Sequence, residues 1–283
     1  MRVGIVGASG FIGRHLQVSL TGRGDGVVAA SARDPRGAAQ AVRDCDAIVF
    51  LAGENIAQRW TAKAKERIRS SRVDATRALL DALAREERRP AAYISASAVG
   101  YYPPSETATY TEESAHGDDF LGTLCAAWEE EAQRAATLGM RVAIVRTGIV
   151  LGRNGGALAK MLPAFQLGFA GVLGTGKQWM SWIHVDDVVG IYRLALDGAS
   201  GVFNACAPRP VTNAEFTKTL ASVLHRPAFA HVPSIALRLM LGDGADILLA
   251  GQRVLPKRTL GTGYTFRLAG LDDALRDLLV TQR

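Results

Sequence analysis

The chain has 283 residues, of which 48% are hydrophobic and 21% charged, and it carries a formal net charge of +6. This length predicts one large domain or two closely packed ones, with a core that needs no disulfide or metal. The composition excludes a disordered, collagen-like or coiled-coil protein. No apolar run reaches the roughly 18–20 residues of a membrane span, and the apolar stretch at the N-terminus is too short for a secretory signal. We therefore expect no association with a membrane.

The cysteines and the positive charge narrow the class of protein further. Cys45, Cys125 and Cys206 show no metal-like spacing, which predicts no metal site and fits a reducing, cytoplasmic location. In the most basic stretch, from Lys63 to Arg72 and on to Arg89, arginines alternate with acidic residues. That mixture is typical of a solvated helix face, so we expect no binding of nucleic acid.

Short apolar segments alternate with longer helical patterns over the first two-thirds of the chain. Because the apolar runs have no polar face, they favour a parallel sheet buried between two helix layers. Repeated strand–helix–strand units imply right-handed crossovers, and so an α/β fold with a Rossmann-type doubly wound parallel sheet. The predicted strands are Val3–Val6, Val27–Ala32, Ile48–Ala52, Ala92–Ser97 and Val142–Arg146, and the predicted helices are Phe11–Leu20, Thr61–Arg88 with an expected break, and Phe120–Leu138.

The pattern changes after about Gly152. One further strand is predicted at Gly201–Ala205, and Asp186 or Asp187 is expected to cap the helix before it. We expect residues 1–156, with about 185–206, to form a dinucleotide-binding domain, and about 157–184 with 207–283 to form a smaller α+β lobe. The other elements predicted here are helices at Ala157–Leu167, Thr212–Leu224, Ser234–Leu241 and from Leu271, a turn at Gly171, Gly174 and Gly176, and an extended piece at Tyr264–Phe266.

A glycine-rich loop follows the first predicted strand and opens the first helix. Its glycines suit a tight turn, close approach of a pyrophosphate to the backbone, and close packing of helix on strand. The helix N-terminus then offers unpaired N–H groups to the phosphates. The alternative is a glycine-rich turn without a ligand, but the position between strand and helix favours nucleotide binding. The loop reads Gly7, Ala8, Ser9, Gly10, Phe11, Ile12, Gly13.

The end of the second strand bears on the choice of cofactor. An NAD-binding protein usually has an acidic residue here to accept from the ribose 2′-hydroxyl, whereas this chain has Arg33 after Ser31. A guanidinium suits a 2′-phosphate, so the residues favour NADP over NAD. The alternative is a surface Arg33 paired with Asp34, which itself stands where the acid of an NAD site might lie.

Several motifs resemble those of extended short-chain dehydrogenases/reductases. More narrowly, the chain is similar to an atypical branch described as NAD-dependent epimerase/dehydratase-like or epimerase family proteins, and the matches run nearly to its C-terminus. Beyond the glycine loop they are Leu51-Ala52-Gly53-Glu54-Asn55-Ile56, Ile94-Ser95-Ala96-Ser97-Ala98-Val99-Gly100-Tyr101-Tyr102, Arg146 to Gly152, Gly155 to Pro163, Ser181 to Asp187 and Gly251 to Pro256.

The resemblance implies an Asn/Ser/Tyr/Lys active site, which this chain keeps only in part. Ser97 matches the serine that hydrogen-bonds the substrate oxygen. Leu121 replaces the tyrosine, Cys125 the lysine, and Arg72 the asparagine. The cofactor site implied beyond the glycine loop consists of Ser31, Arg33, Leu51, Ala52, Gly53, Arg72, Ser95, Thr147 and Gly148.

Because leucine exchanges no proton, another group must serve if the site is catalytic. Cys125 is one candidate, with Arg72 nearby to lower its pKa, although a small buried hydrophobe is the commoner fate of a free cysteine. Tyr101 and Tyr102 are others, since either could supply a phenol or simply pack as an aromatic. His184 could titrate near pH 7, but a core or capping histidine is the simpler interpretation. Glu54 and Arg59 follow the third strand and could contact substrate.

The sequence thus predicts an NADP-dependent oxidoreductase or epimerase-like enzyme that acts on an unidentified small carbonyl or hydroxyl compound. A nucleotide sugar is the usual substrate in the superfamily, but nothing in this chain singles out a sugar site. The alternative is a non-catalytic NADP-binding sensor or interaction protein, which the loss of the tyrosine and lysine would suit. The superfamily also allows a homodimer, which no apolar stripe here requires.

Overall fold

A six-stranded parallel sheet forms the centre of the computed structural model, which describes residues 1–168 and 170–280. The strand order β11-β6-β4-β3-β1-β2 confirms the predicted Rossmann-type doubly wound fold. The predicted strands all form, each within two residues of its expected ends. Their bounds are β1 (Arg2–Val6), β2 (Gly26–Ala30), β3 (Ala47–Phe50), β4 (Ala92–Ala98), β6 (Arg141–Thr147) and β11 (Gly201–Ala205).

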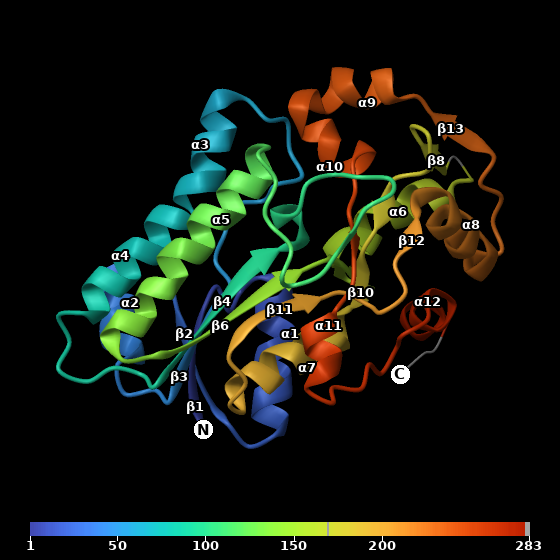
Figure 1. Cartoon of the computed structure of the whole chain (residues 1–283). Helices are drawn as coiled ribbons and strands as arrows, with labels where there is room; N and C mark the ends of the chain where they lie inside the picture. Colours follow the sequence, from blue (N-terminus) through green and yellow to red (C-terminus); the bar gives the residue numbers. More distant parts are fainter. Residues whose placement is uncertain (169, 281–283) are drawn as a thin grey trace.

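Helices cover both faces of the sheet (Figure 1). Alternate residues of β3 point to opposite sides, so Val49 enters a core with α1 and α7 while Phe50 enters a core with α4 and α5. Both cores consist of buried apolar side chains, which explains why the strands read as continuous apolar runs. The helices are α1 (Phe11–Gly22) and α7 (Val185–Leu196) on one face, and α2 (Pro35–Val42), α4 (Val73–Leu83) and α5 (Phe120–Gln133) on the other.

The helices differ from the predictions in three places. The long pattern from Thr61 is broken at Ser71 and Arg72 into α3 (Ala62–Ser70) and α4, as expected, but α4 ends at Leu83, short of the predicted Arg88. The pattern beginning at Phe120 stays α-helical only to Gln133 and ends as a 3₁₀-helix, η2 (Arg134–Leu138). Helix α2 was not predicted, although Asp34 as N-cap and proline at the first helical position are its sequence signals.

A third core, which includes Trp182, Phe216 and Leu275, joins many of the remaining elements. Residues 169 and 281–283 of the predicted smaller lobe lie outside the described residues. The elements are η1 (Val99–Tyr101), β5 (Thr109–Tyr110), β7 (Ile149–Gly152), α6 (Gly156–Gln166), β8 (Gly171–Leu173), β9 (Trp179–Met180), β10 (Trp182–His184), β12 (Val211–Thr212), α8 (Asn213–Leu224), β13 (Ala230–Val232), α9 (Ser234–Leu241), η3 (Gly242–Ala245), α10 (Asp246–Leu249), β14 (Arg253–Val254), α11 (Lys257–Gly261) and α12 (Leu271–Leu279).

Tyr264–Phe266, which was expected to be extended, belongs to no helix or paired strand. One local prediction in this part was wrong. The cap of α7 is His184, whose Nδ1 accepts from the Asp186 N–H at 3.1 Å, and both aspartates lie inside the helix. Asp187 instead accepts from the backbone N–H groups of Arg267 and Leu268, so it fixes the course of the 264–268 segment.

Within the described residues, no helix has the length and apolar character that crossing a membrane requires. The same residues contain no cluster of three or more His, Cys, Asp or Glu side chains arranged to hold a metal ion.

Candidate functional site

The strand order reverses between β1 and β3, so the connections from these strands leave to opposite sides and open a crevice at the carboxyl edge. In doubly wound sheets, ligands bind at this point. The glycine loop lies in the crevice, between β1 and α1. The loop after β3 borders it, because Gly7 packs directly against Ala52.

The loop glycines are required by close backbone contacts. Gly7 has φ +97°, and a Cβ there would lie 2.8 Å from the Ala52 nitrogen. A Cβ on Gly13 would lie 2.4 Å from the Gly7 carbonyl oxygen. Both positions therefore exclude side chains, and α1 begins close against the end of β1.

The first turn of α1 fits a phosphate-bearing cofactor. Its N-cap residue is Gly10, which has no side chain. The first N–H groups of the helix therefore receive no hydrogen bond from an N-cap side chain. The ring of Phe11 is turned away and packs against Gly152 and Gly155, where a Cβ would lie within 2.3 Å of ring carbons. Phe11 is thus available to a ligand through its backbone rather than its ring.

Arg33 lies where β2 ends, beside a pocket of about 400 Å³ between the start of α2 and α4. Arg36 and Arg85 also line the pocket, and none of the three arginines forms an ion pair with a described residue. Asp34 does not pair with Arg33, because its Oδ1 accepts from the Gly37 N–H at 3.0 Å and caps α2. The end of β2 therefore presents unpaired positive charge.

Arg72 fixes the loop after β3 in place. Its Nη2 donates to the Glu54 carbonyl at 2.9 Å and its Nη1 to the Ile68 carbonyl at 3.1 Å, while Gly53 packs against the guanidinium group. Burial lowers the pKa of Arg72. Arg72 thus anchors Gly53 and Glu54 at the crevice, and it forms no ion pair with any described residue.

At the end of β4, Ser97 joins a buried network of charged groups. Its Oγ donates to Glu129 Oε1 of α5 at 2.6 Å. Arg146 of β6 holds the same carboxylate with two bonds, Nε to Oε1 at 2.8 Å and Nη2 to Oε2 at 2.7 Å. Burial alone lowers the pKa of Arg146, but its bonds to Glu129 outweigh burial and hold that pKa above its usual value.

The two tyrosines after Ser97 meet Arg146 in different ways. Tyr102 is fully buried, and its hydroxyl accepts from Arg146 Nη1 at 2.9 Å and donates to Asn204 Oδ1 at 2.8 Å. Burial raises the pKa of Tyr102 to about 12. The ring of Tyr101 is partly exposed and covers the Arg146 guanidinium at 3.4 Å. Of the two phenols, that of Tyr101 is therefore the one nearer to solvent.

Cys125 and Leu121 lie on the face of α5 that meets these residues. Burial, and then the charge of Glu129, raise the pKa of Cys125 to about 12, so the thiol is neutral at pH 7. Leu121 packs against Gly100, where a Cβ would lie 3.2 Å from the Leu121 Cβ. Leu121, which stands where the resemblance implies a tyrosine, is thus next to the residue that precedes Tyr101.

Further predicted site residues line the carboxyl edge in structural roles. Ser95 is fully buried and donates to the Ala96 carbonyl at 3.0 Å. Thr147 ends β6 and Gly148 packs directly on the Ser181 carbonyl. Arg59 donates to the Leu239 carbonyl at 3.3 Å and so ties the loop after β3 to α9. A larger groove of about 880 Å³ lies between α1 and α7, along their helix faces.

The sequence did not single out Glu129, Arg146 or Asn204 as site residues. Glu129 stands in the acidic run Glu129-Glu130-Glu131, which reads as a solvated helix face. Arg146 follows four apolar residues in a buried strand, and that position was the one signal of a buried charge that needs a partner.

A family model described as "NAD dependent epimerase/dehydratase family" matches residues 3–206 of the chain. The chain belongs to this family. The resemblance based on the sequence motifs is thereby confirmed. A second model, "Domain of unknown function (DUF1731)", matches residues 232–278.

Similar proteins match nearly the whole chain. An Arabidopsis thaliana protein, "Epimerase family protein SDR39U1 homolog, chloroplastic", is 40% identical over 99% of this chain and 87% of its own length. The crystal structure of human epimerase family protein SDR39U1 with NADPH is 36% identical over 98% of this chain and 99% of that one, with a TM-score of 0.89. The nucleoside-diphosphate sugar epimerase of Corynebacterium glutamicum is 33% identical over 99% of this chain and 58% of that one, with a TM-score of 0.80.

Proposed function

We propose that the chain is an NADP-dependent oxidoreductase or epimerase that acts on the hydroxyl or carbonyl group of a small compound. The observation that carries this proposal is the crevice itself, in which the glycine loop, the uncapped start of α1 and the unpaired Arg33 follow one another along the carboxyl edge. The NADPH in the human relative and the sugar-nucleotide epimerase from Corynebacterium glutamicum support it, and a nucleotide sugar is the substrate class we favour.

In this proposal the backbone of residues 7–13 holds the pyrophosphate, and Arg33 faces the 2′-phosphate. Each contact uses a group that lacks a strong partner in the structure: the N–H groups of α1 have no cap, and Arg33 has no acid. Arg36 and Arg85 line the same pocket and add positive charge to it. A phosphate monoester there would form charge-assisted hydrogen bonds, whereas the bare hydroxyl of NAD would not.

NADP bound in this way would accept or donate the hydride. The chain's own residues would orient the substrate and handle the proton. Ser97 would contact the reacting oxygen at the end of β4, and Tyr101 would cover the site with its partly exposed ring. Tyr102 would hold Arg146 and Asn204 in position, and Cys125 would line the site as a neutral thiol. The residues of about 157–184 and 207–283 would form the smaller lobe that covers the substrate.

The main alternative is an NADP-binding protein without turnover. One experiment separates the two: calorimetric titration with NADPH, followed by an assay for NADPH consumption with 4-nitrobenzaldehyde and for conversion of UDP-glucose with NADP. Binding together with turnover of either probe supports the enzyme. Binding without turnover of either favours the sensor, and absence of NADPH binding by folded, ligand-free protein contradicts both.

A further inference from the structure

Ser97 is held differently from a free hydroxyl that could donate to a substrate. Its hydroxyl donates to Glu129 Oε1 at 2.6 Å. Arg146 donates to both oxygens of that carboxylate, at 2.8 and 2.7 Å. A carboxylate held by a guanidinium in this two-bond arrangement is ionised and can only accept hydrogen bonds. The Ser97 proton must therefore point toward Glu129.

This orientation leaves the lone pairs of Ser97 Oγ as hydrogen-bond acceptors. Ser97 is only 4% exposed, so its hydroxyl is screened from bulk water. A hydroxyl suits such an acceptor, because it donates one hydrogen bond. A carbonyl oxygen has no proton to donate and meets Ser97 favourably only when the serine proton turns toward it.

We propose that Ser97 and Glu129 together form the proton-accepting pair of this site, with Ser97 in contact with the substrate hydroxyl and Glu129 behind it. The pair takes over the role of the tyrosine that the resemblance implies at the position of Leu121. This proposal rests on the proposed function, since it requires a bound cofactor to take the hydride. Arg146 is a positioning residue, because it orients Glu129 without touching the substrate.

As the substrate alcohol is oxidised, the hydride of its C–H bond passes to oxidised NADP and its O–H bond breaks. The released proton bonds to Ser97 Oγ, while the original Ser97 proton moves to Glu129 Oε1 along the existing hydrogen bond. The products are a carbonyl compound, reduced NADP and a protonated Glu129. Carbonyl reduction follows the same path in reverse, from Glu129 through Ser97 to the oxygen.

Other titratable and charged groups surround Ser97 and Glu129. Arg146 faces Glu129 from β6, and Cys125 lies one helical turn before it on α5. The Cys125 thiol is neutral up to high pH and so adds no charge in the range of the assay. The remaining groups near the network are Tyr101 and Tyr102 of η1, Arg72 at the start of α4, and Glu112, whose backbone carbonyl lies 3.4 Å from Arg146 Nη1.

The test measures oxidation of 4-nitrobenzyl alcohol by NADP in the wild type and in the Glu129→Gln and Glu131→Gln variants. Glutamine keeps the size of Glu129 but cannot accept the proton. We expect kcat to fall by about 100-fold in Glu129→Gln with KM and NADPH affinity within threefold of wild type, because general acid–base groups typically contribute 10²–10⁴-fold. Glu131→Gln should retain the wild-type rate.

Two Ser97 variants keep the proposal testable if Glu129→Gln does not fold. Ser97→Ala leaves the Glu129–Arg146 pair intact and should lose kcat to the same extent, and Ser97→Thr, which restores a hydroxyl, should recover most of it. A Glu129→Gln or Ser97→Ala variant with kcat within threefold of wild type overturns the proposal alone. A wild type that binds no NADPH, or that does not oxidise the alcohol, overturns the proposed function and this proposal with it.

Discussion

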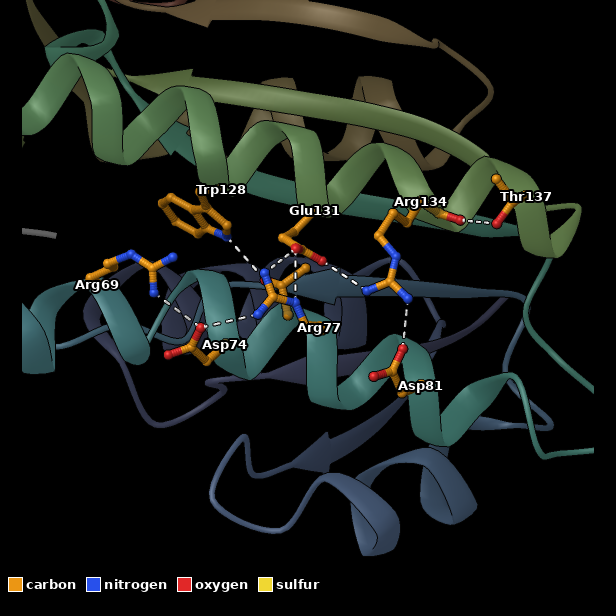
Figure 2. A network of polar contacts seen from close by, with 9 residues as sticks. Arg69, Asp74, Arg77, Asp81, Trp128, Glu131, Arg134 and Thr137 are labelled. Atoms are coloured by element: carbon orange, nitrogen blue, oxygen red, sulfur yellow. Dashed lines mark hydrogen bonds and ion pairs between the residues drawn. The ribbon is translucent and has the colours of Figure 1, made fainter. Parts of the chain in front are cut away.

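Two glutamates on α5, two residues apart, show what position does to the same side chain. Glu129 is buried and meets one arginine, Arg146, and the Ser97 hydroxyl. Glu131 lies on the side of the helix that faces α4, where it joins Arg77 of α4 and Arg134 in a network between α4 and α5 (Figure 2). Glu131 has three charge-assisted bonds, as has Glu129, yet its partners are half exposed.

The number of hydrogen bonds that a carboxylate forms therefore does not determine how much stability is lost when one partner is removed. Around Glu131, water and neighbouring charges such as Asp74 and Asp81 can replace a lost partner. Around Glu129, a lost partner leaves a charge buried without compensation. On the face of α5 that packs against the sheet, a charge therefore has a specific partner that it needs. On the face toward α4, a charged side chain can be substituted at lower cost.

Truncating the two glutamates to alanine, one at a time, should give the greatest contrast in the free energy of unfolding. Glu129→Ala leaves Arg146 buried without its anion and should lower the free energy of unfolding by about 3–5 kcal/mol. Glu131→Ala should cost about 1 kcal/mol or less, because its arginines remain hydrated. Urea denaturation of both variants measures the contrast. Equal losses within 1 kcal/mol would remove the distinction between the two faces.

A smaller effect should separate the two adjacent tyrosines. Tyr102→Phe removes a buried hydroxyl and leaves Arg146 and Asn204 each short of one partner, at an expected cost of about 1–3 kcal/mol. Tyr101→Phe keeps the ring that covers Arg146 and should change stability by less than about 0.5 kcal/mol. Thermal unfolding of both variants checks this, and a more damaging Tyr101→Phe would contradict the assignment of the two phenols.

The smallest expected effect is the pH dependence of stability that Glu131 contributes. Partial burial alone would raise the pKa of Glu131 in the folded chain, but the bonds of Glu131 to Arg77 and Arg134 outweigh burial and lower this pKa. A lowered folded pKa adds stability above the unfolded pKa, and that stability is lost as the pH falls through the folded pKa. The deficit of Glu131→Gln relative to wild type should thus be present at pH 7 and vanish as the pH falls below about 4. Denaturation at both pH values would reveal it, and a deficit that persists in acid would show that charge is not its cause.

The sequence predicted the sheet and the position of the glycine loop because each depends on neighbouring residues, whereas the role of Arg33 stays a prediction. Apolar runs specify buried strands, and Gly7 and Gly13 fall at fixed offsets from the first strand and helix. The network of Glu129 joins three elements that lie 17 and 32 residues apart along the chain, and no local pattern reports such a pairing. In sequence, Glu129 and Glu131 look alike, and only the packing of α5 against β4 and β6 distinguishes them.

The crevice at the carboxyl edge should prefer NADP to NAD, and calorimetry that compares the affinities of NADPH and NADH measures this preference. We predict that NADPH binds the wild type at least about tenfold more tightly, and that Arg33→Ala removes this preference while leaving NADH affinity unchanged. Arg88→Ala, which alters an exposed arginine paired with Asp44 at 3.1 Å, should keep the preference. Equal affinities in the wild type, or a preference that survives Arg33→Ala, would contradict the account.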